Sequence, residues 1–218
     1  MNVKLISVTQ PTIEGEQMSA EELVTYCARV SNPENQMNTE TAPKLINFLI
    51  KHKHWSPFEM VNMCVEIKTS RAIAAQILRH RSFSFQEFSQ RYSEALELEP
   101  LELREQAEDN RQSSSAIVDD EYTLSTANLF MESARDLYKQ LCAMGVARET
   151  ARMLLPLGAQ TTMYMNGNVR SWVHYINLRT EENTQKEHRE VANEVKKIFI
   201  QQFPQISEAL GWVECVES

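Results

Sequence analysis

The amino-acid sequence predicts a mixed fold of helices and strands in which helices dominate. Two strand patterns are clear: residues 3–9 are rich in β-branched side chains, and residues 60–68 alternate between apolar and polar positions. Longer segments repeat apolar residues at helical spacing, above all residues 122–145, which end at Gly145. A chain of 218 residues fits one domain or a tight pair of domains.

Three helices are expected in the first half of the chain, each with a capping residue and apolar side chains at helical spacing. They cover residues 19–30, 41–54 and 69–81. The first begins with a capping box, because Glu22 follows Ser19 by three residues. The third ends in Arg79, His80 and Arg81, so these side chains are expected at a helix C-terminus, where the helix dipole favours cations.

The second half of the chain combines helices with a further strand. Helices are expected over residues 122–145, 147–155, 168–179 and 184–203, and a strand over residues 160–168 that runs into an Asn-Gly turn. Asn168 is expected to cap its helix, on which Arg170, His174 and Asn177 share one face. His188, on the last helix, is expected to be exposed.

Charge is distributed unevenly along the chain. Residues 93–121 carry ten acidic residues against two arginines, and this balance of −8 equals the formal net charge of the whole protein. We interpret this polar stretch as a mobile acidic loop. Residues 71–92 have a balance of +3, because four arginines accompany the single acid Glu87. A local basic site in an acidic protein favours a small anionic ligand over nucleic acid.

The glycines and cysteines exclude several kinds of site. No two of the five glycines are spaced as in a GxGxxG motif or a P-loop, so side chains must hold any bound phosphate. The four cysteines form no CxxC pair, and no histidine pair has metal-ligand spacing, so no metal site is expected. Cys27, Cys64 and Cys142 have no neighbouring histidine or helix N-terminus, so no thiolate nucleophile is expected.

The sequence also allows an expectation about where the protein resides. No apolar run approaches the length of a membrane span, and the N-terminal residues lack a signal-peptide pattern, so the protein is expected in the cytoplasm.

Arg148 and Arg152 are one helical turn apart, a spacing that fits either a phosphate clamp or pairing with Glu149 and solvent. His54 by itself fits a donor at a helix C-terminus.

Several motifs, in this order along the chain, resemble those of the flavin-dependent thymidylate synthases. They are ARVS (28–31), HWSPFE (54–59), QILRHR (76–81), SQRYS (89–93), ARMLLP (151–156) and NVRS…NLR (168–179). The segment RHRSFSFQEFS resembles the family signature of Arg, His, Arg, seven residues and Ser. The resemblance implies a single helix-rich α+β domain over residues 1–218, with a small, mostly antiparallel sheet and the acidic loop 93–121 within it.

The resemblance also implies a reaction and its partners. A flavin-dependent thymidylate synthase methylates dUMP at C5 of uracil to give dTMP, with methylenetetrahydrofolate as the carbon donor. Reduced FAD supplies the hydride, and NADPH reduces the flavin. Members of the family form homotetramers whose active sites are shared between subunits, so the same assembly is expected here.

Residue by residue, the motifs imply two sets of ligand contacts. The flavin is expected to be held by Ser31, His54, Ser56, Glu59, Arg79, His80, Arg81, Glu87, Asn168, Arg170 and His174. The nucleotide is expected to be held by Gln76, Arg79, Glu87, Phe88, Ser89, Gln90, Arg91, Arg152 and Arg179. Without a glycine-rich loop, the arginines in these sets must bind the phosphates.

Arg179 is the candidate catalytic residue that the resemblance implies. C5 of uracil is a poor nucleophile and the chain has no suitable thiolate, so a fixed cation beside the ring would favour negative charge on the pyrimidine. Ser89 is interpreted as a nucleotide contact, because no base is paired with it in the sequence. Two rival functions stay open: a single-strand nucleic-acid-binding module that stacks bases on the aromatic side chains of residues 83–92, and a flavoprotein of other chemistry.

Overall fold

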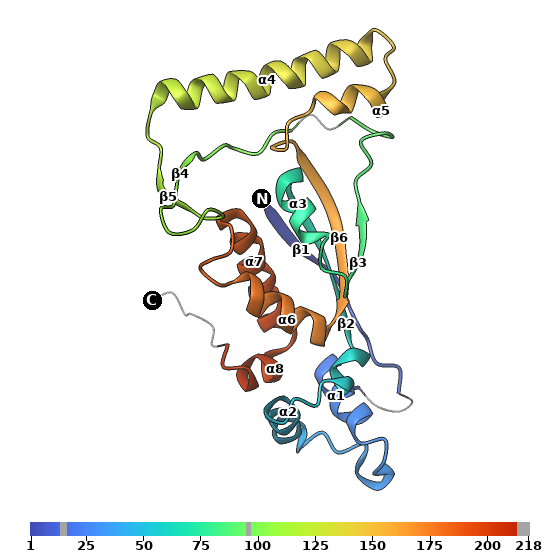
Figure 1. The fold of residues 1–218 in the computed structure, drawn as a ribbon. Helices are drawn as coiled ribbons and strands as arrows, with labels where there is room; N and C mark the ends of the chain where they lie inside the picture. The colour runs from blue at the N-terminus through green and yellow to red at the C-terminus, as the bar shows by residue number, and fades with distance from the viewer. Residues whose placement is uncertain (14–16, 95–96, 213–218) are drawn as a thin grey trace.

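The computed structural model describes residues 1–13, 17–94 and 97–212. Cys215 lies outside these residues. The described part contains a four-stranded sheet, helices that cover one of its faces, a two-stranded hairpin and a long helix across one end (Figure 1). Within the described ranges, no helix is both long enough and apolar enough to cross a membrane.

Neighbouring strands of the four-stranded sheet are all antiparallel. In spatial order the strands are β1 (Asn2–Val8), β2 (Asn62–Ser70), β6 (Gln160–Asn168) and β3 (Ser84–Glu87). The central strands β2 and β6 pair along their whole length, from Asn62 opposite Asn168 to Ser70 opposite Gln160. The expected small antiparallel sheet is therefore confirmed.

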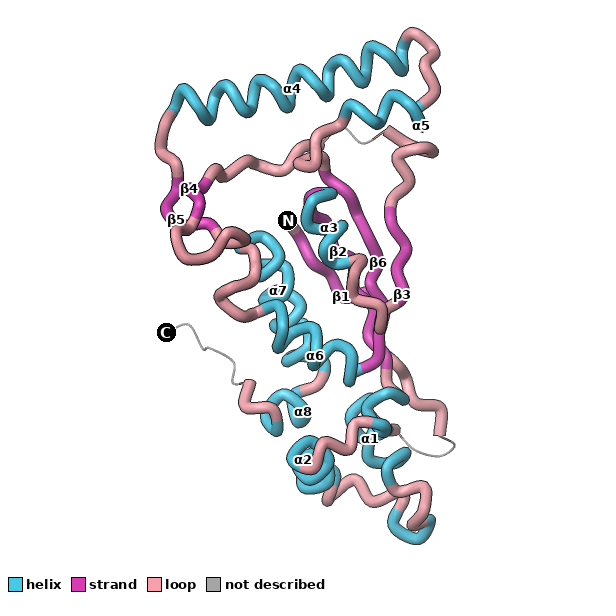
Figure 2. The backbone as a smooth tube through the Cα atoms, in the orientation of Figure 1, coloured by secondary structure: helices cyan, strands magenta, loops and turns pink. Residues whose placement is uncertain are grey.

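The alternating pattern of β2 gives the sheet one buried face. Met63, Val65 and Ile67 are fully buried, whereas the residues between them are partly exposed. The indole N–H of Trp172 donates a hydrogen bond to the backbone carbonyl of Met63 at 2.9 Å. The helices on this face are α3 (Arg71–Ile77), α6 (Val169–Arg179) and α7 (Lys186–Gln202) (Figure 2). Each buried aliphatic side chain contributes about 1.5–3 kcal/mol, so this face is a main source of stability.

Helix α3 is shorter than the sequence pattern predicted. Strand β2 continues to Ser70, which also caps the helix by accepting a hydrogen bond from the backbone N–H of Ile73 at 3.3 Å. The helix ends at Ile77, and the backbone N–H of His80 bonds to the Ile77 carbonyl at 3.0 Å. Residues 79–81 therefore lie in a turn just beyond the helix and not in its last turn.

Strand β6 does not end in the expected Asn-Gly turn. Asn166 and Gly167 pair within the sheet, opposite Cys64 and Met63. A Cβ atom at position 167 would lie 2.4 Å from a carbon of the Phe83 ring. Glycine is therefore needed here for the close approach of an aromatic ring to the strand and not for a turn.

Short helices cover the end of the sheet where β2 begins (Figure 1). They are α1 (Ala20–Ala28), α2 (Ala42–Lys51), α8 (Pro204–Ala209) and the 3-10 helices η1 (Pro33–Asn35) and η2 (Ser56–Met60). The predicted capping box of Ser19 and Glu22 is present. Glu21 is buried and accepts a hydrogen bond from the backbone N–H of Ile206 at 2.7 Å, which joins α1 to α8. Burial raises the pKa of Glu21.

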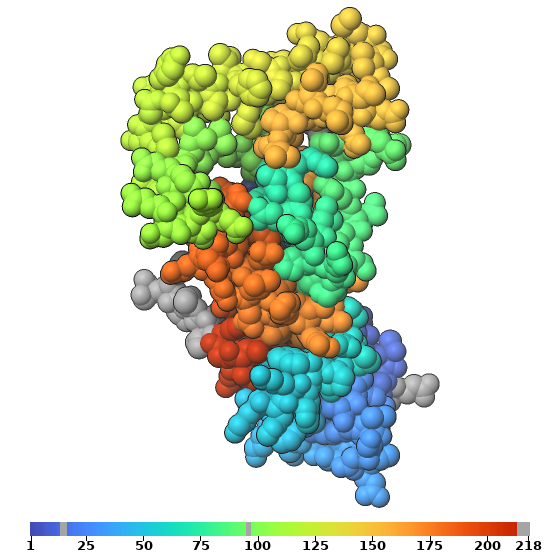
Figure 3. Space-filling model, viewed as in Figure 1, coloured from blue at the N-terminus to red at the C-terminus, as the bar shows by residue number. Residues whose placement is uncertain are grey.

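The opposite end of the sheet carries the segment between β3 and β6. It consists of β4 (Arg104–Gln106), β5 (Ser114–Ile117), α4 (Glu121–Ala143), α5 (Arg148–Ala151) and the 3-10 helix η3 (Arg152–Leu154). The β4–β5 hairpin lies inside the acidic stretch that was interpreted as irregular. Helix α4 forms a ridge across this end of the molecule (Figure 3) and is followed by Gly145 with a φ of 87°, as its pattern predicted. Of its side chains only Met131 and Tyr138 are buried.

Candidate active site

The two central strands each lead directly into a helix, from opposite ends of the same pair. Ser70 ends β2 and caps α3, whereas Asn168 ends β6 and caps α6 by accepting a hydrogen bond from the N–H of Ser171 at 2.9 Å. Because the strands are antiparallel, α3 and α6 approach the middle of the sheet from opposite ends. This topology brings His80, which follows α3, against Arg179, the last residue of α6.

A hydrogen bond joins these two residues. Nε of Arg179 donates to Nε2 of His80 at 2.9 Å. A nitrogen that accepts must carry a lone pair, so His80 is neutral and holds its proton on Nδ1. Burial, helped by the charge of Arg179 and by His174, lowers the pKa of His80 to about 4. The terminal nitrogens of Arg179 have no protein partner among the described residues, so they are available to a ligand.

The arginine side chains at this bond have no acidic partners in the part of the chain that the structure describes. Arg79 and Arg81 are both exposed, on either side of His80. Within the described residues, neither they nor Arg179 form an ion pair with an acid. Guanidinium groups bind phosphates and carboxylates through paired N–H donors. The cluster is therefore suited to an anionic ligand.

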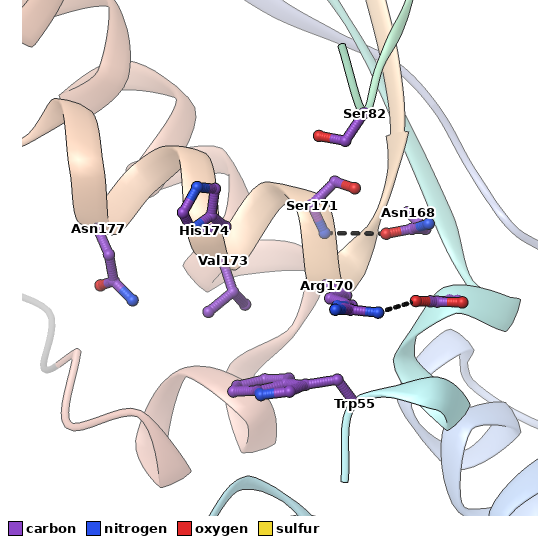
Figure 4. Close-up of a pocket in the computed structure, with 9 residues that line it drawn as sticks. Trp55, Ser82, Asn168, Arg170, Ser171, Val173, His174 and Asn177 are labelled. Carbon is purple, nitrogen blue, oxygen red and sulfur yellow. Dashed lines mark hydrogen bonds and ion pairs between the residues drawn. The ribbon is translucent and has the colours of Figure 1, made fainter. Parts of the chain in front are cut away.

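A cleft of about 650 Å³ opens beside the start of α6 (Figure 4). The side chains that line it are Trp55, Glu59, Ser82, Asn168, Arg170, Ser171, Val173, His174 and Asn177. The ring of Trp55 lies opposite Val173, and Arg170 forms an ion pair with Glu59 at the wall of the cleft (Figure 4). The cleft thus combines a flat aromatic surface with amide and guanidinium donors.

The structure brings part of the expected flavin set together. The implied residues that line the cleft are Glu59, Asn168, Arg170 and His174. The face that the helical pattern assigned to Arg170, His174 and Asn177 does turn toward the cleft. Ser31, His54 and Ser56 are exposed and do not line it. The lining residues that sequence reasoning missed are Trp55, Ser82, Ser171 and Val173, and each directly adjoins a residue that was named.

Glu87, implied for both ligands, is already engaged within the protein. Its Oε1 accepts a hydrogen bond from Nη1 of Arg71 and another from the hydroxyl of Thr161, both at 2.9 Å. These bonds fix the end of β3 to β6 and to the start of α3. Its Oε2 makes no hydrogen bond to the described residues and remains free to accept one from a ligand.

Phe88, Ser89 and Arg91 of the expected nucleotide set directly follow β3, on the side toward α5. The backbone N–H of Phe88 bonds to the carbonyl of Thr162 at 2.9 Å, near the start of β6. Ser89 and Arg91 line a second depression of about 390 Å³ together with Arg148. This depression offers a hydroxyl and two guanidinium groups, the donors that a phosphate requires.

The two arginines near α5 do not pair with the Glu149 side chain. Arg148 forms an ion pair with Glu94 at 3.5 Å, and Nε of Arg152 donates to the backbone carbonyl of Glu149 at 3.4 Å. Gln90 is buried, and its amide nitrogen has no partner within the described residues. A buried donor without a partner is costly, so Gln90 is a group that a bound ligand would satisfy.

The cleft and the second depression are far apart within one chain. The cleft adjoins Asn168 at the end of β6, whereas Ser89 and Arg91 follow the residue bonded to Thr162 near its start. At the rise of a strand, the stretch from Thr162 to Asn168 spans about 20 Å. The cleft and the second depression therefore lie near opposite ends of the central strand, whereas His80 of the flavin set and Arg179 of the nucleotide set are bonded to each other.

His188 is fully buried, so the prediction that it would be exposed is wrong. Its ring contacts Gln76 and Tyr175. Burial, helped by the nearby charge of Arg179, lowers the pKa of His188 to about 3. The signal was present in the sequence, because His188 stands three residues before the buried Val191 on the same helix.

The cysteines show no sign of activation. Cys27, Cys64 and Cys142 are free and half-buried. Burial raises the pKa of the Cys27 and Cys64 thiols, which reduces the thiolate fraction at neutral pH. Over the ranges that the structure describes, no group of histidine, cysteine and acidic side chains is arranged to hold a metal ion.

The sheet, the cleft beside α6 and the unpaired arginines define a helix-rich α+β protein whose exposed side chains are suited to anionic ligands. The chain belongs to the Thy1 family, described as thymidylate synthase complementing protein, whose model matches residues 15–205. The family resemblance of the motifs is thereby confirmed.

Individual relatives are similar over nearly their full length. A probable flavin-dependent thymidylate synthase of Paramecium bursaria Chlorella virus 1 is 52% identical over 218 residues, which cover 98% of this chain and 100% of the relative. The flavin-dependent thymidylate synthase of Synechocystis sp. is 50% identical over 221 residues, which cover 97% and 100%. The crystal structure of a UMP/dUMP methylase, PolB from Streptomyces cacaoi, bound with 5-Br dUMP, matches with a TM-score of 0.79 at 25% identity. That match covers 96% of this chain and 94% of PolB, and it confirms the fold.

Proposed function

We propose that this chain is a flavin-dependent thymidylate synthase that methylates dUMP at C5 to give dTMP. The observation that carries the proposal is its 52% and 50% identity, over nearly the whole chain, to proteins of that name. FAD is the flavin, methylenetetrahydrofolate is the carbon donor, and NADPH reduces the flavin. The reaction is thus a step of de novo dTMP biosynthesis.

The cleft beside α6 fits the flavin. Its volume of about 650 Å³ lies within the usual range of small-molecule sites. Trp55 offers a flat apolar surface, Asn168 offers an amide, and Arg170 offers a cation for an anionic cofactor. FAD bound here supplies the hydride chemistry, for which the protein has no group of its own. Glu59 keeps the Arg170 guanidinium at the wall of the cleft.

Arg179 is the group we assign to activation of the uracil ring. His80 holds its Nε and adds no charge of its own, so the terminal nitrogens form one fixed cation. Placed beside the pyrimidine oxygens, such a cation stabilises the negative charge that loss of the N3 proton produces. Activation of this kind needs no cysteine nucleophile, in keeping with the raised pKa values of the Cys27 and Cys64 thiols.

We also propose that the active sites are shared between subunits of a homotetramer. Reacting atoms must approach within about 3–3.5 Å, yet the flavin cleft and the depression at Ser89 and Arg91 lie near opposite ends of β6. Joining the cleft of one chain to the depression of another removes this conflict. Large apolar side chains exposed on α4, such as Leu129 and Phe130, support a subunit contact there.

The nucleic-acid rival gains no support from the aromatic side chains of residues 83–92. Base stacking needs exposed rings, but Phe83 is only 9% exposed and packs against Gly167. Among the aromatic side chains of residues 83–92, Tyr92 alone is exposed.

The free thiols of Cys27, Cys64 and Cys142 accord with the cytoplasm as the place of the proposed reaction.

The test of the proposed function is FAD-dependent formation of dTMP. Purified protein is stripped of flavin and incubated under low oxygen with dUMP, methylenetetrahydrofolate and NADPH, with and without added FAD. Product that depends on FAD is expected. Flavin-loaded protein that forms no dTMP would contradict the proposal in favour of another flavin reaction. Salt-dependent binding of single-stranded DNA without flavin binding would favour the nucleic-acid module.

A further inference from the structure

One buried histidine joins the three helices that cover the sheet. Nδ1 of His188 on α7 lies 3.2 Å from Oε1 of Gln76 on α3. Its Nε2 lies 3.2 Å from the hydroxyl of Tyr175 on α6. His188 and Tyr175 are both fully buried, whereas Gln76 is half-buried and belongs to the expected nucleotide set. The hydrogen bonds of the histidine therefore reach the expected nucleotide set through Gln76, and its ring centroid also lies 6.3 Å from that of His80.

From Gln76 the contacts continue to an ion pair. Nε2 of Gln76 donates to Oε1 of Gln185 at 2.6 Å, and Nε2 of Gln185 donates to Oε2 of Glu187 at 2.9 Å. Oε1 of Glu187 accepts from Nη2 of Arg104 on β4 at 2.6 Å. Burial acts to raise the pKa of Glu187, but its hydrogen bonds outweigh this effect and lower the pKa. Glu187 is therefore charged at neutral pH.

The charged carboxylate fixes the direction of every bond in this chain. A carboxylate only accepts hydrogen bonds, so Gln185 must turn its NH2 group toward Glu187 and its carbonyl toward Gln76. The NH2 group of Gln76 must then face Gln185, and its carbonyl must face His188. His188 must donate from Nδ1, which leaves Nε2 to accept from the hydroxyl of Tyr175.

The buried side chains of His188 and Tyr175 are both uncharged at neutral pH. Burial lowers the pKa of His188 to about 3 and raises the pKa of Tyr175. The imidazole is therefore neutral and the phenol is protonated. This state is the one that the direction of the hydrogen bonds requires.

The arrangement leaves Gln76 with one unused N–H. Its carbonyl is turned toward His188, and one of its two N–H groups is bonded to Gln185. A ligand atom that meets the remaining N–H must be a hydrogen-bond acceptor, such as a phosphate, sugar or uracil oxygen. An amide free to rotate could equally offer its carbonyl to a ligand donor.

We propose that His188 is a positioning residue for nucleotide recognition: it holds the Gln76 amide so that an N–H, and not the carbonyl, faces dUMP. The inference rests on the proposed function, because it takes Gln76 to be a dUMP contact. Binding of a nucleotide with an acceptor at this point is favoured. A nucleotide with a donor there is rejected, since it would leave a polar group unpaired.

Two substitutions of similar shape separate positioning from packing. His188→Asn places an amide nitrogen where histidine carries Nδ1 and so keeps the donor to Gln76, whereas His188→Leu removes it. In flavin-loaded protein, His188→Leu is expected to raise the dissociation constant for dUMP about five- to tenfold, the effect of losing one aligned hydrogen bond. His188→Asn is expected to restore most of the affinity. Equal losses in both variants would overturn the proposal.

A double-mutant cycle with Gln76→Ala tests whether His188 acts through Gln76. In the Gln76→Ala background, His188→Leu should cause no further loss of dUMP affinity, whereas additive losses would contradict the inference. Val195→Ala is the matched control, because Val195 is equally buried on α7 and takes no part in the hydrogen-bonded chain. It should lower Tm and leave dUMP binding unchanged. Weaker dUMP binding in this control would point to packing of α7 and overturn the proposal.

The wild-type protein separates this inference from the function on which it rests. If the wild type binds dUMP and forms dTMP while His188→Leu binds dUMP equally well, the inference alone fails. If flavin-loaded wild type does not bind dUMP at all, the proposed function fails and the inference fails with it.

Discussion

Arg179 donates its Nε–H to Nε2 of His80 at 2.9 Å, so the guanidinium is anchored by a residue that carries no charge. The bond uses Nε and leaves Nη1 and Nη2 without a partner among the described residues. An acidic partner would neutralise the charge of the guanidinium, and a protonated histidine would repel it. The neutral imidazole positions the cation without weakening it, as stabilisation of a developing anion requires.

Replacement of Arg179 should therefore affect turnover more than ligand loading. Arg179→Ala is expected to lower kcat by about 100-fold or more, because it removes the fixed cation beside the ring. Arg179→Lys keeps the charge but has no Nε–H for His80, so it should recover little activity. Flavin absorbance of the purified variants should match the wild type. Arg111→Ala, an exposed arginine of the hairpin segment, serves as the control. Normal turnover in Arg179→Ala would refute the assignment.

The buried His188 and the half-buried His80 make the fold sensitive to acid. The folded-state pKa is about 4 for His80 and about 3 for His188, both below the ordinary histidine value near 6.5. Below pH 6.5 the unfolded chain binds more protons than the folded one. The free energy of unfolding should thus fall as the pH drops from about 6.5 toward 4, by up to about 1.4 kcal/mol per pH unit for the buried His188 and by less for the half-buried His80, where solvent screens the effect.

Denaturant unfolding at a series of pH values tests this expectation. His188→Leu should lose the share of the slope that His188 contributes, while the share of His80 persists. The comparison with the variant matters because Glu21, whose pKa is raised by burial, gains protons on folding and acts in the opposite direction. An identical slope in wild type and His188→Leu would contradict the prediction.

The ion pair of Arg170 and Glu59 should matter for flavin and little for folding. The two side chains are 54% and 35% exposed, and pairs of this kind contribute at most about 1 kcal/mol to stability. Arg170→Met is therefore expected to leave Tm nearly unchanged. It should raise the dissociation constant for FAD about ten- to 100-fold, since it removes a charge-assisted contact. Flavin fluorescence titration measures this constant. Lys4→Met, which removes an ion pair with Glu66 outside the cleft, should change neither quantity. Unaltered FAD affinity in Arg170→Met would remove Arg170 from the flavin site.

Shared active sites predict complementation between inactive variants. Arg91→Ala damages the nucleotide set and Arg170→Ala the flavin set, so each is expected to be inactive alone. Co-assembled tetramers contain sites with one intact set from each chain, and part of the activity should return. Arg91→Ala combined with the double variant Arg91→Ala/Arg170→Ala should stay inactive, because no chain then has an intact nucleotide set. Failure to complement in mixed tetramers would place both sets in one subunit.

Local signals in the sequence were sufficient for the helix starts that position the site. Ser19 and Asn168 cap their helices as predicted, because a capping side chain bonds to a backbone N–H only three residues away. The face of α6 that lines the cleft could likewise be read from residue spacing. Such features depend on near neighbours in the chain.

Features set by distant contacts escaped sequence reasoning. Gly167 lies within a strand because the ring of Phe83 packs on it, and nothing in the Asn-Gly pair reveals that contact. The β4–β5 hairpin lies in an acidic stretch, where Arg104 bonds to Glu187, far along the chain. The separation of the cleft from the depression at Ser89 and Arg91 likewise follows from the pairing of β6 with β3 and not from the order of the motifs.

The pairing of β2 with β6 also determines which part of the structure unfolds last during local unfolding. Strand β1 pairs with β2 from Met63 to Lys68, and β3 pairs with β6 from Met163 to Asn166, so the amide hydrogens in the middle of the β2–β6 pair should exchange with solvent most slowly. Helices α3 and α6 both begin on this pair. Ligands should therefore enter and leave through motions of the outer segments, without any opening of the central strand pair.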